Sequence, residues 1–208
     1  MTKIFVVGDS ISMHYNDDLK RFLSGYAMLK RKGEGEKPGD LDYESKVNGG
    51  DSACVLGYLQ ATPDIDADIF IVNCGLHDIK FYHEVGHLQV EPEDYRENLK
   101  QIVAHIQKLG KQMVWVMSTT VDDEIHKKNC SVFFRKNEDI KQYNHIAKEV
   151  MEQMGVPIID LYDFTEKLGD GVFCDHVHFK PHVRTLHAAF IAGQVIGLFG
   201  LKKTNELS

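Results

Sequence analysis

The sequence predicts a single-domain α/β protein in which helices cover both faces of a five-stranded parallel sheet, giving three layers in the order α/β/α. Short apolar segments alternate with longer amphipathic segments along the chain, which is typical of repeated β-α units. Residues 68–74 are apolar on both faces, as strands in the middle of a parallel sheet are. The 208 residues, 43% of them hydrophobic, suffice for one core. We therefore assign residues 1–200 to one domain and 201–208 to a C-terminal tail.

Five segments have the composition of strands. Each is short, contains β-branched or aromatic residues, and is followed by a turn or an irregular segment. They comprise residues 4–8, 43–47, 68–74, 111–117 and 156–160. The stretch from 29 to 40 is charged and contains Gly and Pro, so we expect a surface loop there that buries nothing.

Five segments carry apolar residues at helical spacing. They comprise residues 11–26, 52–59, 92–109, 137–154 and 182–198. Pro92 suits the first turn of its helix, and Gly110 ends that helix. The remaining segments 118–134 and 161–173 are predicted to be irregular. Because 118–134 follows a strand end, we expect it to border the functional site.

Composition and charge exclude several classes of function. The net charge of -7, with Lys and Arg scattered among acidic residues, argues against a nucleic-acid partner. The first apolar run is too short for a signal peptide or a membrane span, so we expect a cytoplasmic protein with no membrane partner. The four cysteines are isolated and include no C-x-x-C pair, which favours reduced thiols. The oligomeric state stays open.

Histidine patterns give no convincing metal site. His176, His178 and His182 lie close together, and His83 and His87 are at helical spacing. Neither set is accompanied by a second group of ligands at recognisable spacing, so we expect no metal and no other cofactor. His176 is interpreted instead as a neighbour of a catalytic base.

The residues after the first strand suit a nucleophile. That strand stops at Gly8, and Asp9 and Ser10 favour a turn and a helix start. The Ser10 hydroxyl would then lie beside a helix N-terminus, where backbone N–H groups favour developing negative charge. A structural helix cap is the alternative for Ser10. Asp9 and Asp78 are expected to hold their turns through hydrogen bonds to the backbone.

Acyl transfer also needs a base and donors for the oxyanion. A serine hydroxyl is a weak nucleophile unless an imidazole takes its proton and a carboxylate orients that imidazole. His178 and Asp175 lie three residues apart on one loop and can supply both. The backbone N–H groups of Ser10 and Gly50, and the turn at His77, are candidate donors for the oxyanion.

Four segments resemble a known family. The segments Gly8-Asp9-Ser10-Ile11-Ser12, Asn48-x-Gly50, Gly75-Leu76-His77-Asp78 and Asp175-x-x-His178 are similar, in order, to the four blocks of the SGNH, or GDSL-type, hydrolases. The resemblance implies an SGNH-hydrolase-like fold with a flavodoxin-like strand order. It implies Ser10, His178 and Asp175 as nucleophile, base and acid, and Ser10 N–H and Gly50 N–H as oxyanion donors. Asn48 would be a supporting residue.

His77 departs from the family pattern, in which an asparagine side chain is the third oxyanion donor. A neutral imidazole can donate one hydrogen bond, although its reach differs from that of an amide and its charge depends on pH. Phe133, Phe134 and Arg135 either line an acyl or leaving-group pocket or simply begin a helix. The loops 31–40 and 119–134 are where we expect substrate specificity to lie.

Three functions remain open from the sequence. The first is a serine esterase that hydrolyses a small carboxylic ester, such as an O-acetyl group on a sugar, through an acyl-enzyme; a thioesterase or lysophospholipase of the same family is a variant of it. The second is a non-catalytic ligand-binding protein with the same scaffold. The third is a flavodoxin-like or nucleotide-binding protein, but the first turn lacks G-x-G-x-x-G and a P-loop lysine.

Overall fold

A computed structural model describes residues 1–204 and contains a parallel sheet of five strands in the order β2-β1-β3-β6-β7. The strands are β1 (Thr2–Val7), β2 (Ala27–Arg31), β3 (Ile69–Val72), β6 (Gln112–Val116) and β7 (Ile158–Ile159). Each neighbouring pair in this sheet is parallel. The predicted fold class, including the flavodoxin-like strand order, is confirmed.

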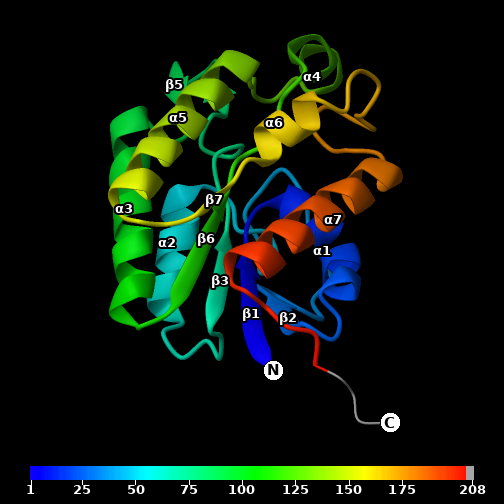
Figure 1. The fold of residues 1–208 in the computed structure, drawn as a ribbon. Coiled ribbons are helices and arrows are strands. Elements are labelled where there is room, and N and C mark those ends of the chain that lie inside the picture. The colour runs from blue at the N-terminus through cyan, green and yellow to red at the C-terminus, as the bar shows by residue number, and fades with distance from the viewer. Residues whose placement is uncertain (205–208) are drawn as a thin grey trace.

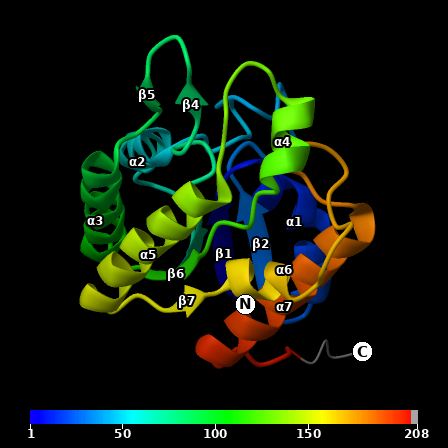
Figure 2. The ribbon, with the colours of Figure 1, turned by 90° about the horizontal axis from the view of Figure 1, so that it is seen from above.

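Helices form a layer on each face of this sheet (Figures 1 and 2). One layer consists of α1 (Ser10–Phe22) and α7 (Pro181–Leu198), which pack against each other. The opposite layer consists of α2 (Ser52–Ala61), α3 (Pro92–Lys108) and α5 (Asn137–Gln153). Because α1 and α7 share a face, the first and last helices of the chain are neighbours.

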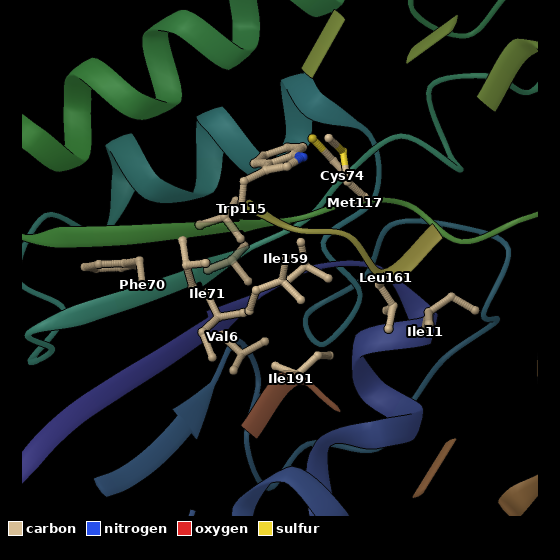
Figure 3. Close-up of a cluster of buried hydrophobic side chains, with 14 of the residues drawn as sticks. Val6, Ile11, Phe70, Ile71, Cys74, Trp115, Met117, Ile159, Leu161 and Ile191 are labelled. Carbon is tan, nitrogen blue, oxygen red and sulfur yellow. The ribbon is translucent and has the colours of Figure 1, made fainter. Parts of the chain in front are cut away.

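The core lies between the sheet and these helices. All four residues of β3 are buried, as expected for a strand with neighbours on both sides. Figure 3 shows Val6 of β1 facing Ile191 of α7, with Trp115 of β6 on the other side of the sheet. All three side chains are at most 1% exposed. Apolar burial on both faces fixes the sheet that carries the site.

The second strand of the sheet is not where the sequence predicted it. The prediction of a strand at 43–47 is wrong, because that segment belongs to the long connection after β2. The strand is Ala27–Arg31, in which buried and exposed residues alternate. Such period-2 alternation is typical of an edge strand. The preceding helix α1 ends at Phe22, and Gly25 turns the chain with φ +81°.

The predicted loop at 29–40 buries two cationic side chains, contrary to the expectation. Arg31 and Lys32 are 8% and 3% exposed. Lys32 Nζ donates to the carbonyl oxygens of Asn48, at 2.7 Å, and Ser45, and Arg31 Nη2 donates to the Val47 carbonyl at 3.1 Å. These carbonyls replace the water that the cations lose. The two side chains thereby anchor the segment before Gly50 to the end of β2.

Short elements at the carboxyl ends of the strands were not predicted. A hairpin is formed by β4 (Phe81–Tyr82) and β5 (His87–Leu88). The supposedly irregular segments 118–134 and 161–173 contain α4 (Asp123–Asn129) and α6 (Leu161–Glu166), each capped by an aspartate at its N-terminus. Figure 1 shows β5, α4 and α6 above the sheet, at the end opposite the N-terminus.

The last residues that the structure describes, up to Thr204, are hydrogen-bonded to the turn after α1. In the predicted tail 201–208, Thr204 N–H donates to the Gly25 carbonyl at 2.7 Å, and residues 205–208 lie outside the described residues. Within residues 1–204, none of the helices combines the length and the apolar character that crossing a membrane requires.

Candidate active site

Ser10 lies at the junction between the central sheet and α1. It is the first residue of α1, and Asp9 caps the helix by accepting a hydrogen bond from Ile11 N–H at 2.9 Å. The first N–H groups of a helix have no acceptor within it, so the Ser10 N–H can serve a ligand. Ser10 is 4% exposed and its hydroxyl lies at the carboxyl edge of the sheet.

The three residues predicted as nucleophile, base and acid meet in one hydrogen-bonded series. His178 Nε2 lies 2.8 Å from Ser10 Oγ, and His178 Nδ1 lies 2.7 Å from Asp175 Oδ2. The packing of α1 against α7 brings together these two segments from opposite ends of the chain. The order hydroxyl, imidazole, carboxylate is the one that proton transfer from a serine requires.

Local hydrogen bonds keep Asp175 ionised and fixed in position. Its Oδ1 accepts from the N–H groups of Val177, at 2.9 Å, and His178, at 2.7 Å. Burial raises the pKa of Asp175, but the hydrogen bonds from the His178 ring and from these two N–H groups hold it well below its usual range. An ionised carboxylate accepts from Nδ1–H of His178, so Nε2 carries the lone pair that faces Ser10.

Gly50 has the backbone conformation that its turn requires, but its N–H is already engaged. Its φ is +73°, and the N–H donates to Asn48 Oδ1 at 3.0 Å. Asn48 is itself held by a bond from its Nδ2 to the Leu41 carbonyl at 2.9 Å. An oxyanion would therefore have to share the Gly50 N–H with Asn48 or displace Asn48.

His77 lines a cavity of about 290 Å³ together with Gly50 and Lys80. The histidine is 4% exposed, and burial, reinforced by the positive charges of Lys80 and Arg135, holds its pKa well below the usual value. His77 is thus a neutral imidazole at pH 7 and retains one N–H donor. Arg135 Nε donates to the Leu76 carbonyl at 2.7 Å and so fixes the turn that carries His77.

Comparison with known proteins identifies the family. The GDSL-like lipase/acylhydrolase family matches residues 6–182. This chain belongs to that family. It is 24% identical over 142 residues to the GDSL esterase/lipase CPRD49 of Arabidopsis thaliana, a match that covers 64% of this chain and 54% of CPRD49. The chain therefore spans about half the length of that curated relative.

Solved structures share the fold over nearly the whole chain. The lipase/acylhydrolase from Enterococcus faecalis superposes with a TM-score of 0.72 at 20% identity, covering 98% of both chains. Est24, a carbohydrate acetylesterase from Sinorhizobium meliloti, superposes with a TM-score of 0.64 at 14% identity, covering 96% of this chain and 100% of that one. At these identities the likeness shows the fold alone.

His14 lies beside the His178 ring, and the sequence analysis did not identify it as a site residue. Its ring packs edge-on against the ring of His178, with centroids 4.8 Å apart. Burial, together with the charges of His178 and Arg184, lowers the pKa of His14 to about 4, so it adds no charge beside His178 at pH 7. The only signal in the sequence is its position four residues after Ser10, which places both on one side of α1.

Asp78 joins the third GDSL-family segment to α2. Its Oδ1 accepts from Ser52 N–H at 2.9 Å, whereas its Oδ2 is buried without a partner among the described residues. Burial raises the pKa of Asp78 to about 7 despite the bonds from Ser52. Asp78 thus holds the third segment to the first residue of α2, shortly after Gly50, at an electrostatic cost.

A second series of polar side chains lies next to the one formed by Asp175, His178 and Ser10. The sequence analysis did not group its residues. His176 Nε2 lies 3.2 Å from Asp42 Oδ2, and His176 Nδ1 lies 3.1 Å from His126 Nδ1. His176 is also near His178, with ring centroids 5.9 Å apart. Asp42 comes from the long connection after β2 and His126 from α4, and neither belongs to a motif.

Phe133, Phe134 and Arg135, which precede α5, do not all line the same cavity. Phe133 and Phe134 line a cavity of about 340 Å³ with Cys130. Arg135 is not among the residues that line it; its guanidinium lies over the Phe133 ring, 4.7 Å from the centroid, and is 1% exposed. Phe133 and Phe134 therefore line a cavity, whereas Arg135 packs on Phe133 and holds the Leu76 carbonyl.

Proposed function

We propose that this member of the GDSL-like family is a serine esterase that hydrolyses a small carboxylic ester through an acyl-enzyme. The observation that carries the proposal is the continuous series from Asp175 through His178 to Ser10, with distances of 2.7 and 2.8 Å. Ser10 Oγ attacks the ester carbonyl carbon while His178 Nε2 accepts the hydroxyl proton. Asp175 stabilises the imidazolium that forms.

The negative charge that develops on the carbonyl oxygen needs hydrogen-bond donors. The Ser10 N–H is available at the start of α1, and the Gly50 N–H is available once it is shared with Asn48. The neutral His77 ring supplies a third N–H where the family pattern has an asparagine amide. Each such donor contributes roughly 10²–10³-fold to the rate.

The reaction is completed by three further proton transfers through the same imidazole. His178 returns its proton to the alcohol oxygen as the carbon–oxygen bond breaks, which leaves the acyl group on Ser10. A water molecule then attacks the acyl carbonyl, and His178 accepts its proton. Collapse of this second intermediate returns the proton to Ser10 Oγ and releases the carboxylic acid.

The cavity beside His77 favours a polar substrate. Seven of its nine lining residues carry side chains that can form hydrogen bonds, namely Tyr43, Glu44, Asp51, His77, Lys80, Tyr82 and Gln89. Such a lining suits hydroxyl groups better than an acyl chain. An O-acetylated sugar fits this chemistry, and the fold neighbour Est24 is itself named a carbohydrate acetylesterase. A long-chain thioester or lysophospholipid would leave these polar groups unpaired.

Turnover of nitrophenyl esters of increasing acyl-chain length, measured beside turnover of acetylated sugars, tests both the reaction and the substrate class. We expect a burst of nitrophenol, fastest turnover with acetate, and loss of turnover in Ser10→Ala. A fluorophosphonate probe should label the wild-type chain and not Ser10→Ala. Absence of labelling in the folded wild-type protein would instead support the non-catalytic binding alternative, and a preference for long acyl chains would overturn the acetyl assignment.

A further inference from the structure

A cluster of metal-ligating side chains lies beside the proposed active site and has no part in the proposed reaction. It consists of His126 on α4, Cys130 at the C-terminal end of α4, and His176 on the segment that precedes α7. One ligand atom from each residue lies within 4.8 Å of the other two. His126 is completely buried and the His176 side chain is 11% exposed, so the two imidazoles are shielded from bulk water, whereas Cys130 is half-buried.

The spacing of the two histidine nitrogens fits a tetrahedral ion. His126 Nδ1 and His176 Nδ1 face each other at 3.1 Å. A zinc ion with bonds of about 2.0–2.1 Å to nitrogen would hold two such atoms about 3.3 Å apart. His126 and Cys130 are four residues apart, and the Cys130 N–H donates to the His126 carbonyl at 2.9 Å, so both side chains project from one side of the helical turn.

Asp42 orients the His176 ring, as carboxylates often do for histidines that bind a metal. Its Oδ2 lies 3.2 Å from His176 Nε2, and its Oδ1 lies 3.6 Å from an Arg135 nitrogen. Donation from Nε2–H to this carboxylate leaves the lone pair of His176 on Nδ1, which points toward His126. A carboxylate on the far nitrogen of a ligating histidine is a recurrent feature of zinc sites.

We propose that the chain binds one divalent transition-metal ion, Zn²⁺ above all, through His126, Cys130 and His176. Two imidazoles and a thiolate are a ligand set for Zn²⁺ and not for Ca²⁺ or Mg²⁺, which prefer oxygen. Cys130 also lines the cavity of about 340 Å³ beside Phe133, from which a water molecule can occupy the fourth position. On binding, the Cys130 thiol gives its proton to the solvent.

The ion would connect α4 to the segment that carries Asp175 and His178. Figures 1 and 2 both show α4 beside the chain that leads into α7. His178 itself is not a ligand, because its two nitrogens already meet Ser10 and Asp175. The metal therefore acts as a structural link next to the proposed reaction centre, and it takes no part in ester cleavage.

Titration with Co²⁺ tests the site directly, because the absorption spectrum of bound Co²⁺ depends on its ligands and their geometry. The protein is produced without a histidine tag, dialysed against a chelator and titrated with Co²⁺. We expect one ion per chain, the intense visible absorption of tetrahedral Co²⁺, a near-ultraviolet thiolate charge-transfer band, and displacement by Zn²⁺. Ser10→Ala should bind identically, which separates this proposal from the proposed esterase.

Variants identify the ligands. Cys130→Ser should abolish the charge-transfer band and weaken Co²⁺ binding by about 100-fold or more, whereas Cys174→Ser, on an exposed thiol near His176, should change neither. Asp42→Asn should keep the band and weaken binding about 10–100-fold. A wild-type spectrum without a thiolate band, or a band that survives in Cys130→Ser, would overturn the proposal. A plain hydrogen bond from one neutral imidazole to the other would then explain the 3.1 Å contact.

Discussion

At the scale of single residues, Asp175 decides which nitrogen of His178 faces the nucleophile. In Asp175→Asn the side-chain oxygen can still accept from the N–H groups of Val177 and His178, but the amide would present a donor to Nδ1. Nε2 would then carry the proton and could not accept one from Ser10. We expect kcat to fall roughly 10²–10⁴-fold with little loss of stability.

The measurement is turnover of nitrophenyl acetate at pH 7, with thermal unfolding followed in parallel. Asp64→Asn, a change of the same type at an exposed position, is the matched control. Turnover of Asp175→Asn close to that of the wild type would remove this carboxylate from the mechanism.

His77 gives a second prediction at the same scale. If its ring N–H contacts the oxyanion, His77→Asn restores the family's donor and should keep much of the activity, whereas His77→Ala should lose about 10²-fold in kcat. The pKa of His77 is held well below its usual value by burial and by Lys80 and Arg135, so the ring is neutral at pH 7. The acidic side of the pH profile should therefore be the same in His77→Asn and the wild type.

Equal activity in all three proteins would show that this side chain does not contact the oxyanion. A shift of the acidic side of the profile in His77→Asn alone would show that the ring titrates during turnover.

Single residues could be predicted where they belong to a recognisable motif. His178 and Asp175 are three residues apart and share a loop, so their roles could be inferred from the sequence. His176 contacts Asp42 and His126, which lie 134 and 50 positions away and follow no spacing rule. Such pairs become visible only when the connections after β2 and β6 are placed over the sheet.

At the scale of elements, the turn before α2 depends on a glycine. Gly50 has φ +73°, and a Cβ there would meet Glu44 Cβ at 2.7 Å and Cys54 Cβ at 3.2 Å. Gly50→Ala should therefore cost about 1–2 kcal/mol in the free energy of unfolding, and more if Glu44 cannot move. It should also reduce kcat, because the Gly50 N–H would be displaced.

Gly57 is the matched control, since it lies in the middle of α2 and a methyl group added there would meet nothing within 4 Å. Gly57→Ala should stabilise the protein by roughly 0.5–1 kcal/mol. Urea unfolding of both variants measures the difference. Two alanine variants of equal stability would show that the turn at Gly50 has room to relax.

Element prediction succeeded where burial leaves a clear pattern. The central strand β3 is buried on both faces, and α3 and α5 carry long apolar stripes, so their sequences indicate their positions. The edge strand β2 was missed because its pattern of alternating buried and exposed residues is short. It also ends in Arg31, and arginine is seldom buried. The two-residue strands β4 and β5 are too short to show a period.

At the scale of the whole molecule, the electrostatic cost at Asp78 should appear in the pH dependence of stability. Its pKa rises from 3.8 to about 7 because burial disfavours the carboxylate and outweighs the hydrogen bonds from Ser52. A group whose pKa is raised by folding stabilises the folded state fully below its unfolded pKa, and that contribution is lost as the pH rises through the folded pKa. Asp78 should thus lower the free energy of unfolding progressively between about pH 4 and pH 7.

Asp78→Asn isolates this effect, because the amide oxygen can keep the bond to Ser52 N–H while no charge is buried. The stability difference between variant and wild type should change in favour of the variant from pH 5 to pH 8, by at most about 3 kcal/mol at 1.4 kcal/mol per pKa unit. Asp42 and Asp175 have lowered pKa values, so their contributions are lost only below about pH 4 and do not enter this window. Urea unfolding at both pH values measures the change, with Asp64→Asn as the control. A difference that is the same at pH 5 and pH 8 would mean that Asp78 does not titrate in this range.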